Sequence, residues 1–328
     1  MRTPYRLHLL AGCLALAGFL LGPVHRAEAG SEAGAISVTI PPGVRGEAMG
    51  GLFIPEANDY SARWWNPAGL AFVSRPIIGT MYSQLVPGLA TDVYFMYGGY
   101  IHPTHSIGTM QVDLTYLSYG QSTATDEAGT DKGTFSSYEL SPALALGFKF
   151  LPSLGLGVAV KYVRVDLAPS SVLRDPSGAG SGVGTSWAFD LGGLYRANRL
   201  RLGTVVSNLG PDITFIDAEQ SDPMPRTLRM GGMYDILSSE VSQVRAGAEW
   251  ERPLVTLKTP SIYHAGAEFV YMNTFALRAG YLYDKQGDVK GLSGGFGFTW
   301  SGASLEYANV PQATDLDRVH RFALWLKR

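Results

Sequence analysis

Few residues in this chain have the types and spacing that catalysis or metal binding would require. His102 and His105 flank Pro103-Thr104 in an expected short turn. A helical zinc motif places two histidines four residues apart, and a zinc site needs further Cys, His or carboxylate ligands, which the neighbouring residues do not supply. No Gly-x-Ser-x-Gly nucleophile motif occurs either. We therefore expect no catalytic residue, no metal site and no cofactor.

Three other sets of polar or glycine residues have simpler explanations than catalysis or ligand binding. His264 and Glu268 lie on the same face of one expected strand, where a polar network with neighbouring strands would suit a barrel interior. The network would include Arg245, Glu249 and Arg278. The glycine run 178–184 lacks the Lys-Ser/Thr ending of a phosphate-binding loop. Asp126, Glu127 and Asp131 could suggest a cation site, but an exposed acidic loop is the simpler account.

Composition separates this chain from ordinary soluble proteins. Charged residues make up 16% of it, against about 25% in a typical soluble protein. It contains 17 Tyr, 14 Phe, 6 Trp and 40 Gly, which suits a twisted, curved sheet. The net charge of −2, without a basic stripe, argues against nucleic acid as a partner.

Period-two alternation recurs from residue 75 to the end of the chain. Met110, Val112 and Leu114 alternate with Gln111 and Asp113. Successive side chains of a strand point to opposite faces, so each such segment has one apolar and one polar face. In a membrane barrel the apolar face meets lipid and the polar face meets the lumen, whereas a soluble barrel reverses this arrangement. Aromatic residues near segment ends are typical of interface girdles, although strand propensity alone would also explain them. These residues are Tyr97, Tyr100, Tyr116, Tyr119, Tyr281, Tyr283, Trp300 and Trp325.

The gaps between segments are alternately long and short. Short gaps occur at 102–105, at 151–153 and near Asn198, Asn273 and Ser301. Long polar gaps lie at 120–137, 168–184, 208–225 and 311–318. Outer-membrane barrels have short periplasmic turns and long outer loops. We therefore predict an all-β, transmembrane antiparallel β-barrel of about fourteen strands over 72–328, in contact with outer-membrane lipid.

The first 29 residues resemble a secretory signal peptide. Arg2 and Arg6 give a basic start, Leu9–Leu21 is apolar, and Ala27-Glu28-Ala29 is a small-x-small cleavage site. Leu10-Ala11-Gly12-Cys13 looks like a lipoprotein cleavage box, but cutting there would leave too short an apolar core. Export through a cleaved signal peptide, 1–29, to the outer membrane is the favoured interpretation.

Residues 30–71 lack sustained alternation and are expected to fold back into the lumen as a plug. Adjacent tryptophans in this segment favour burial over a flexible extension. A short helical piece at 47–49 is expected between tight turns. Candidate plug or ligand-contacting residues are Glu47, Met49, Gly50, Gly51, Trp64, Trp65 and Asn66. Turn geometry for the glycines and core packing for the tryptophans are the simpler alternatives.

Several stretches follow one another in order along nearly the whole chain. They are Val44–Gly51, Ala57–Asp59, Trp65–Leu70, Val206–Pro211, Met224–Gly231, Gly266–Glu268, Ala276–Tyr281 and His320–Leu324. Together they resemble the PorV/PorQ family, which belongs to the FadL-like β-barrel superfamily. The chain departs from the family in ending Leu326-Lys327-Arg328 rather than on an aromatic residue, and in carrying Glu47 and Glu56.

The resemblance implies two alternative functions. A PorV-like protein would assist type IX secretion and surface attachment, with secreted cargo and a translocon as partners and the gaps 120–137, 168–184 and 208–225 as the contact surface. A FadL-like protein would transport long-chain fatty acids or other hydrophobic compounds. Trp64 and Trp65 would then contact the ligand, and Gly50–Gly51 would be the hinge of a gate. A purely structural or adhesive barrel is a third alternative.

Overall fold

A computed structural model describes residues 34–104, 106–125, 128–169, 182–215, 221–256, 258–313 and 316–328. The chain divides into two compact units, Met1–Ser31 and Glu32–Arg328. Several features expected from the sequence lie outside the described residues. They are the signal peptide, the lipoprotein box, Asp126, Glu127 and most of the gap at 168–184. The signal peptide, and the division at residues 29 and 71, therefore stay predictions.

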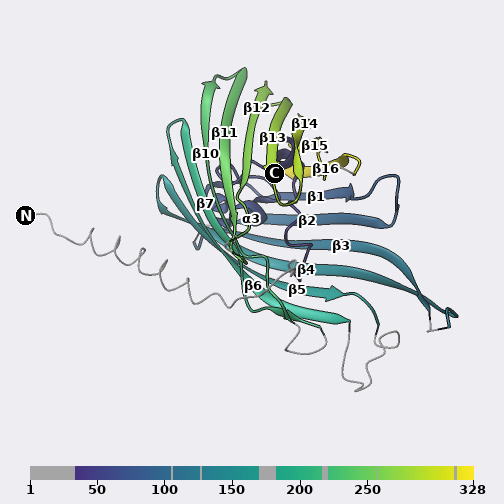
Figure 1. The fold of residues 1–328 in the computed structure, drawn as a ribbon. Helices are drawn as coiled ribbons and strands as arrows, with labels where there is room; N and C mark the ends of the chain where they lie inside the picture. Colours follow the sequence, from purple (N-terminus) through teal and green to yellow (C-terminus); the bar gives the residue numbers. More distant parts are fainter. Residues whose placement is uncertain are drawn as a thin grey trace, which may run out of the picture. The chain divides into compact units, whose positions relative to one another are not determined.

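The second unit is a closed barrel of fourteen long antiparallel strands, which confirms the predicted fold class (Figure 1). Strand β1 pairs with both β2 and β16, and β5 pairs with β6, so the sheet closes on itself. The long strands are β1 (Ile77–Gln84), β2 (Val93–Pro103), β3 (Thr109–Thr125), β4 (Asp131–Leu151), β5 (Leu154–Asp166), β6 (Val183–Ala197), β7 (Leu200–Leu209), β10 (Thr227–Ser238), β11 (Ser242–Pro253), β12 (Ile262–Tyr271), β13 (Phe275–Asp284), β14 (Val289–Trp300), β15 (Ala303–Val310) and β16 (Val319–Lys327).

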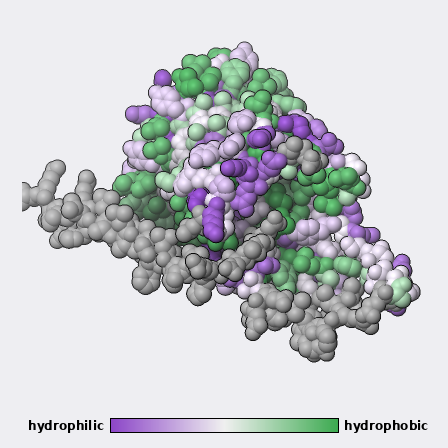
Figure 2. Space-filling view, in the orientation of Figure 1, coloured by the Kyte–Doolittle hydropathy of each residue, from purple (hydrophilic) through white to green (hydrophobic). Residues whose placement is uncertain are grey.

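Side chains alternate between lumen and outside along the strands, and charged residues lie mostly on the lumen side. Some apolar residues, such as Phe95 and Ile101 of β2, also point inward and pack in the core. In β3, Gln111 and Asp113 are buried, whereas Val112 and Leu114 are 49% and 44% exposed. Apolar residues form broad patches on the visible surface (Figure 2). This arrangement is the reverse of a soluble barrel and agrees with a wall that faces lipid.

Aromatic residues form part of the expected girdle. Tyr82, Tyr94, Tyr116 and Tyr138 make a row across β1–β4, with neighbouring ring centroids 5.8–6.0 Å apart. Trp300, at the short-turn end of β14, is 73% exposed. Three expected girdle residues instead point inward, because they find partners inside the barrel. Tyr97 packs on Tyr60, the Tyr119 hydroxyl donates to Glu139, and Trp325 packs against the buried core.

The short turns are confirmed, but one of the long gaps is not a loop. Gly120 pairs with Ser137 and Thr125 with Asp131, so the polar stretch at 120–137 is mostly the continuation of β3 and β4. This ribbon runs past the neighbouring strands, since β2 pairing stops at Tyr119 and β5 pairing stops at Tyr138 (Figure 1). Beyond the membrane both faces of a strand pair can meet water, so a fully polar sequence suits it.

The gap at 208–225 also contains structure. Strands β8 (Ile213–Thr214) and β9 (Ser221–Asp222) form a small hairpin, and β8 also pairs with β6 at Thr185.

The segment 34–76, hereafter the plug, lies inside the barrel. It contains α2 (Val44–Ala48), α3 (Ala62–Trp65) and the 3₁₀-helix η1 (Pro67–Phe72). Helix α2 packs against β13–β16, and η1 packs against β3–β6. The helical piece expected at 47–49 is therefore α2, which begins earlier. Within the described residues, no helix is long and apolar enough to cross a bilayer.

The topology predicts which segments are exposed on cells. A protease site inserted at Gly129, where an added Cβ would meet nothing within 4 Å, should be cut on intact cells. The same site at Ser153, in the short β4–β5 turn, should be cut only after the outer membrane is permeabilised. The opposite pattern of cleavage would contradict this orientation. Gly180, the second outer position suggested by the sequence, lies outside the described residues.

Candidate functional site: the plugged lumen

The two adjacent tryptophans pack within the plug and against the wall. Trp65 is fully buried, and its Nε1 donates to the carbonyl oxygen of Pro42 at 2.8 Å. The Trp64 and Trp65 rings meet edge to face, with centroids 4.9 Å apart. The Arg229 guanidinium, from β10, lies 5.0 Å from the Trp65 ring centroid and 5.7 Å from that of Trp64. Packing thus accounts for Trp65, because its one polar atom is satisfied.

Trp64 is only partly buried and lines a small cavity between the plug and the wall. Lys161, Asn208 and Arg229 also line this cavity, whose volume is about 60 Å³. Trp64 is therefore the one sequence-predicted aromatic with free space beside it.

Asn66 holds the turn between α3 and η1. Its side-chain oxygen accepts from the backbone N–H of Ala68 at 3.0 Å, which caps η1. Its side-chain nitrogen donates to the carbonyl oxygens of Ile54 and Gly193. This fully buried amide thus ties the plug to β6.

Gly50 and Gly51 are pressed against the wall in a left-handed conformation. Their φ angles are 73° and 84°, and a Cβ on Gly50 would lie 2.6 Å from the backbone nitrogen of Tyr281. His264 Nδ1 lies 2.8 Å from the Gly50 carbonyl oxygen, and Arg229 donates to that of Gly51 at 2.9 Å. The glycines are required by close approach, and the gating hinge stays a hypothesis.

Met49 and Glu47 complete the sequence-predicted residues. Met49 is fully buried, and its backbone lies so close to the wall that a Cβ on Gly280 would meet its carbonyl carbon at 2.0 Å. Glu47 forms an ion pair with Arg321 of β16 at 3.1 Å. The structure thus brings all seven predicted residues into the plug–wall contact.

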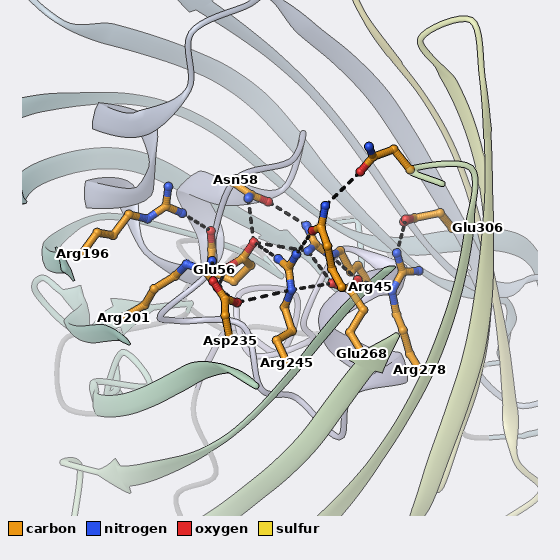
Figure 3. A network of polar contacts seen from close by, with 12 residues as sticks. Arg45, Glu56, Asn58, Arg196, Arg201, Asp235, Arg245, Glu268, Arg278 and Glu306 are labelled. Carbon is orange, nitrogen blue, oxygen red and sulfur yellow. Dashed lines mark hydrogen bonds and ion pairs between the residues drawn. The ribbon is translucent and has the colours of Figure 1, made fainter. Parts of the chain in front are cut away.

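The centre of that contact is a network of buried charges (Figure 3). The Glu56 carboxylate of the plug is paired with Arg45, Arg201 and Arg245, at 3.3, 2.9 and 2.7 Å. Glu268 of β12 pairs with Arg45 at 2.7 Å and with Arg278 and Arg245. Arg45 therefore forms ion pairs with both Glu56 of the plug and Glu268 of the wall.

Electrostatics hold Glu56 in its charged form. Burial opposes ionisation, but Arg45, Arg245 and Arg201 outweigh it and hold the pKa of Glu56 below its ordinary value. The carboxylate is 2% exposed and so depends on these partners.

A second buried cluster fixes the other side of the plug. Arg63 of α3 donates from Nε to Asp113 Oδ2 at 2.9 Å and lies 3.5 Å from Asp190. Lys161 reaches the same Asp190 at 2.9 Å. Sequence analysis missed Arg45 and Arg63 as site residues. The sequence did contain an indication of their role. Both are cations in a segment expected to be buried, and the strands around that segment carry acids at lumen-facing positions.

Asp59 lacks a cation of its own. Its Oδ1 accepts from the backbone N–H and the hydroxyl of Ser61, while its buried Oδ2 has no hydrogen-bond partner among the described residues. Burial, with the nearby Glu306 carboxylate, raises the pKa of Asp59 to about 6.

No group of three His, Cys, Asp or Glu side chains that could hold a metal ion occurs in the part of the chain that the structure describes. The polar network expected around His264 and Glu268 is present and is occupied by ion pairs.

A fourteen-stranded barrel with polar lumen, lipid-facing apolar wall and internal plug defines the class of plugged outer-membrane barrels. The fold is similar to that of the Ralstonia pickettii toluene transporter TbuX (TM-score 0.57, 13% identity, 87% of this chain and 98% of that chain). It is also similar to the P. putida toluene transporter TodX (TM-score 0.53, 14% identity, 87% and 96%). A Pseudomonas aeruginosa FadL homologue is similar as well, with a TM-score of 0.51 and 14% identity; the match covers 87% of this chain and 98% of that chain. These likenesses establish the fold.

The family follows from the sequence. Residues 30–261 match the profile of "Type IX secretion system protein PorV", so the chain belongs to the PorV family, which is not a family of enzymes. No curated protein sequence gives a significant match.

Removing the charge of Glu56 should loosen the plug. Glu56→Gln leaves Arg45, Arg201 and Arg245 short of a buried counter-charge, a change that costs about 3 kcal/mol or more. We expect a cysteine placed at buried Ala62 to react much faster with a membrane-impermeant maleimide in this variant. Glu240→Gln, an exposed acid of the β10–β11 turn, is the control. Equal labelling in both variants would show that Glu56 does not hold the plug.

Ionisation of Asp59 should make stability depend on pH. Its pKa is about 6 in the folded chain against an ordinary 3.8, so stability should fall as pH rises from about 4 to 6 and stay level above that. Asp59→Asn should abolish this fall and gain about 3 kcal/mol at neutral pH, with little change near pH 4. Thermal unfolding in detergent, followed by tryptophan fluorescence at both pH values, measures the effect. If Asp59→Asn stabilises the protein equally at pH 4 and at neutral pH, ionisation of Asp59 is not the cause of the pH dependence.

Proposed function

We propose that this chain assists type IX secretion by receiving secreted cargo at its outer rim and helping to deliver it for surface attachment. The observation that carries the proposal is a lumen filled by a plug held with buried ion pairs, beside an outer rim with projecting structure. Membership of the PorV family supports it. Under this proposal the partners are secreted cargo proteins and the secretion translocon.

The contact surface would be the three outer segments named from the sequence. The β3–β4 ribbon, from Gly120 to Ser137, extends beyond the paired ends of its neighbours. The segment 208–225 adds the β8–β9 hairpin, which is packed on the wall through Thr185. The segment 168–184 lies mostly outside the described residues.

Transport of hydrophobic compounds is the second candidate, supported by the fold likeness to toluene transporters. In that case Trp64 would contact the ligand, and movement at Gly50–Gly51 would open the path. The cavity beside Trp64 argues against this role in the plugged state, because its volume is about 60 Å³, whereas a cavity known to bind benzene has about 150 Å³. A purely adhesive barrel would use the same outer segments without secretion partners.

The proposal includes the route to the membrane. A signal peptide at 1–29 would be cleaved on export, leaving 30–71 to enter the lumen of the barrel formed by 72–328. Sequencing the amino terminus of the purified mature protein tests this directly.

A loop-shortening variant tests the cargo role. Replacing residues 121–136 by Asn-Gly would close the ribbon at the paired Gly120 and Ser137 with a favoured two-residue turn. We expect surface-attached cargo to drop at least about tenfold if the ribbon supplies a central contact, while barrel assembly persists. The matched control replaces residues 285–288 by Asn-Gly between paired Asp284 and Val289.

The readouts separate the candidates. The tagged chain is isolated in mild detergent from its native host, bound proteins are identified by mass spectrometry, and surface cargo is quantified on both variants. Co-isolated secreted proteins that share a C-terminal domain, lost with the ribbon only, would support cargo delivery. Intact cargo attachment in cells lacking the whole barrel would refute it. Slowed uptake of toluene or oleate in those cells would favour transport.

A further inference from the structure

The part of the short-turn rim that runs from β16 through β1 to β7 carries only positive charge. Exposed basic side chains lie at the entry to β1, in the β4–β5 and β6–β7 connections and at the chain's end. They are Arg75, Lys149, Arg199, Lys327 and Arg328. No Asp or Glu occurs in residues 74–76, 102–109, 147–155, 195–201 or 325–328. Since β16, β1 and the strands on to β7 are neighbours in order, these cations occupy one continuous arc.

The outer rim has no such arc. In the β13–β14 connection, Asp284, Lys285, Asp288 and Lys290 mix both signs. On the short-turn side, the rest of the rim carries acids. Asp235 is already paired with Arg201 at 3.0 Å, and Glu240 of the β10–β11 turn is exposed. None of the five arc cations forms an ion pair with a carboxylate of the described residues. Like charges gathered without counter-charges repel one another, and an anionic partner relieves that repulsion.

Two of the cations, Lys149 and Lys327, lie on the lumen side of the wall and not on the lipid side. Lys149 continues the inward-facing series of β4, in which Ala143, Ala145 and Gly147 are buried. Lys327 likewise continues the buried series Arg321 and Ala323 of β16. Outward positions at this level are apolar: Phe150 and Leu326 are 54% and 41% exposed. A lipid headgroup beside the wall would therefore meet apolar residues before Lys149 or Lys327.

One cation of the arc, Lys149, lies beside the end of the plug. Lys149 Nζ lies 5.6 Å from the Phe72 ring centroid, and the Arg196 guanidinium lies 4.7 Å from it. Arg196 also donates to the carbonyl oxygen of Glu56 at 3.1 Å, so it links the mouth to the buried network. Anything bound over this mouth would touch the plug.

We propose that the short-turn mouth is a docking surface for an acidic, water-soluble polypeptide segment in the periplasm. The arc supplies several cations along one part of the rim, with Lys149 beside the Phe72 ring, which suits a segment carrying successive carboxylates. The proposal goes beyond cargo delivery at the outer rim and does not depend on it.

The test uses the full barrel in nanodiscs of zwitterionic lipid and a fluorescein-labelled oligoglutamate peptide as probe. Binding is followed by fluorescence anisotropy at low and high salt. We expect salt-sensitive binding that weakens at least about tenfold in the triple variant Arg75→Gln, Lys149→Gln, Arg199→Gln, since each exposed charge contributes modestly. The matched control removes three exposed outer lysines, Lys258→Gln, Lys285→Gln and Lys290→Gln, and should bind like the parent.

Several outcomes would overturn the proposal. Absence of binding to the parent barrel would do so, as would equal weakening in both triple variants. Binding of the parent to anionic phosphatidylglycerol vesicles that is lost in the mouth variant, without peptide binding, would identify lipid headgroups as the occupant instead. Unchanged thermal unfolding of each variant excludes misfolding as the cause of any loss.

Discussion

The structure depends on the pairing of charges that the plug carries into the lumen. Glu56 and Arg63 are almost completely buried, and each would be strongly destabilising there without a counter-charge. The wall supplies those counter-charges from strands far apart in sequence, β7 and β11 for Glu56, and β3 and β6 for Arg63. The plug is therefore stable only inside this barrel. The inward-facing charges of the strands serve as counter-charges for the plug as well as contacts for water.

Close backbone contact completes the seal. Wall glycines leave room where the plug backbone touches the sheet. A Cβ on Gly157 would lie 2.2 Å from Pro67, and one on Gly266 would lie 2.3 Å from Met49. Ion pairs hold the plug to the wall, and wall glycines let the plug backbone approach the sheet closely. The lumen is therefore filled by polypeptide. A barrel so filled is suited to work at its two rims, which is why we place both proposed contacts there.

The two rims differ in chemistry. One extends a polar ribbon beyond its neighbours, and the other carries an arc of cations, of which Lys149 lies beside the end of the plug. Arg196 connects the second rim to the buried network through the Glu56 carbonyl. A partner bound at the short-turn rim could therefore reach the plug directly at Phe72 or act on it through Arg196.

The sequence by itself determined the barrel, the direction of its faces and the short turns, because period-two alternation and turn spacing are local properties of a chain. The family was indicated separately, by stretches of sequence that resemble it and by the profile match over 30–261. The sequence also led us to expect a plug at 30–71; the seven candidate residues lie in the segment 34–76 inside the barrel, and their roles stay predictions. It misread Gly120–Ser137 as a loop, because a polar strand pair in water has no apolar face to reveal it. Only the tertiary structure decided that Glu56 meets Arg201 and Arg245, since those partners come from strands about 145 to 190 residues away and no local pattern encodes which strands face the plug.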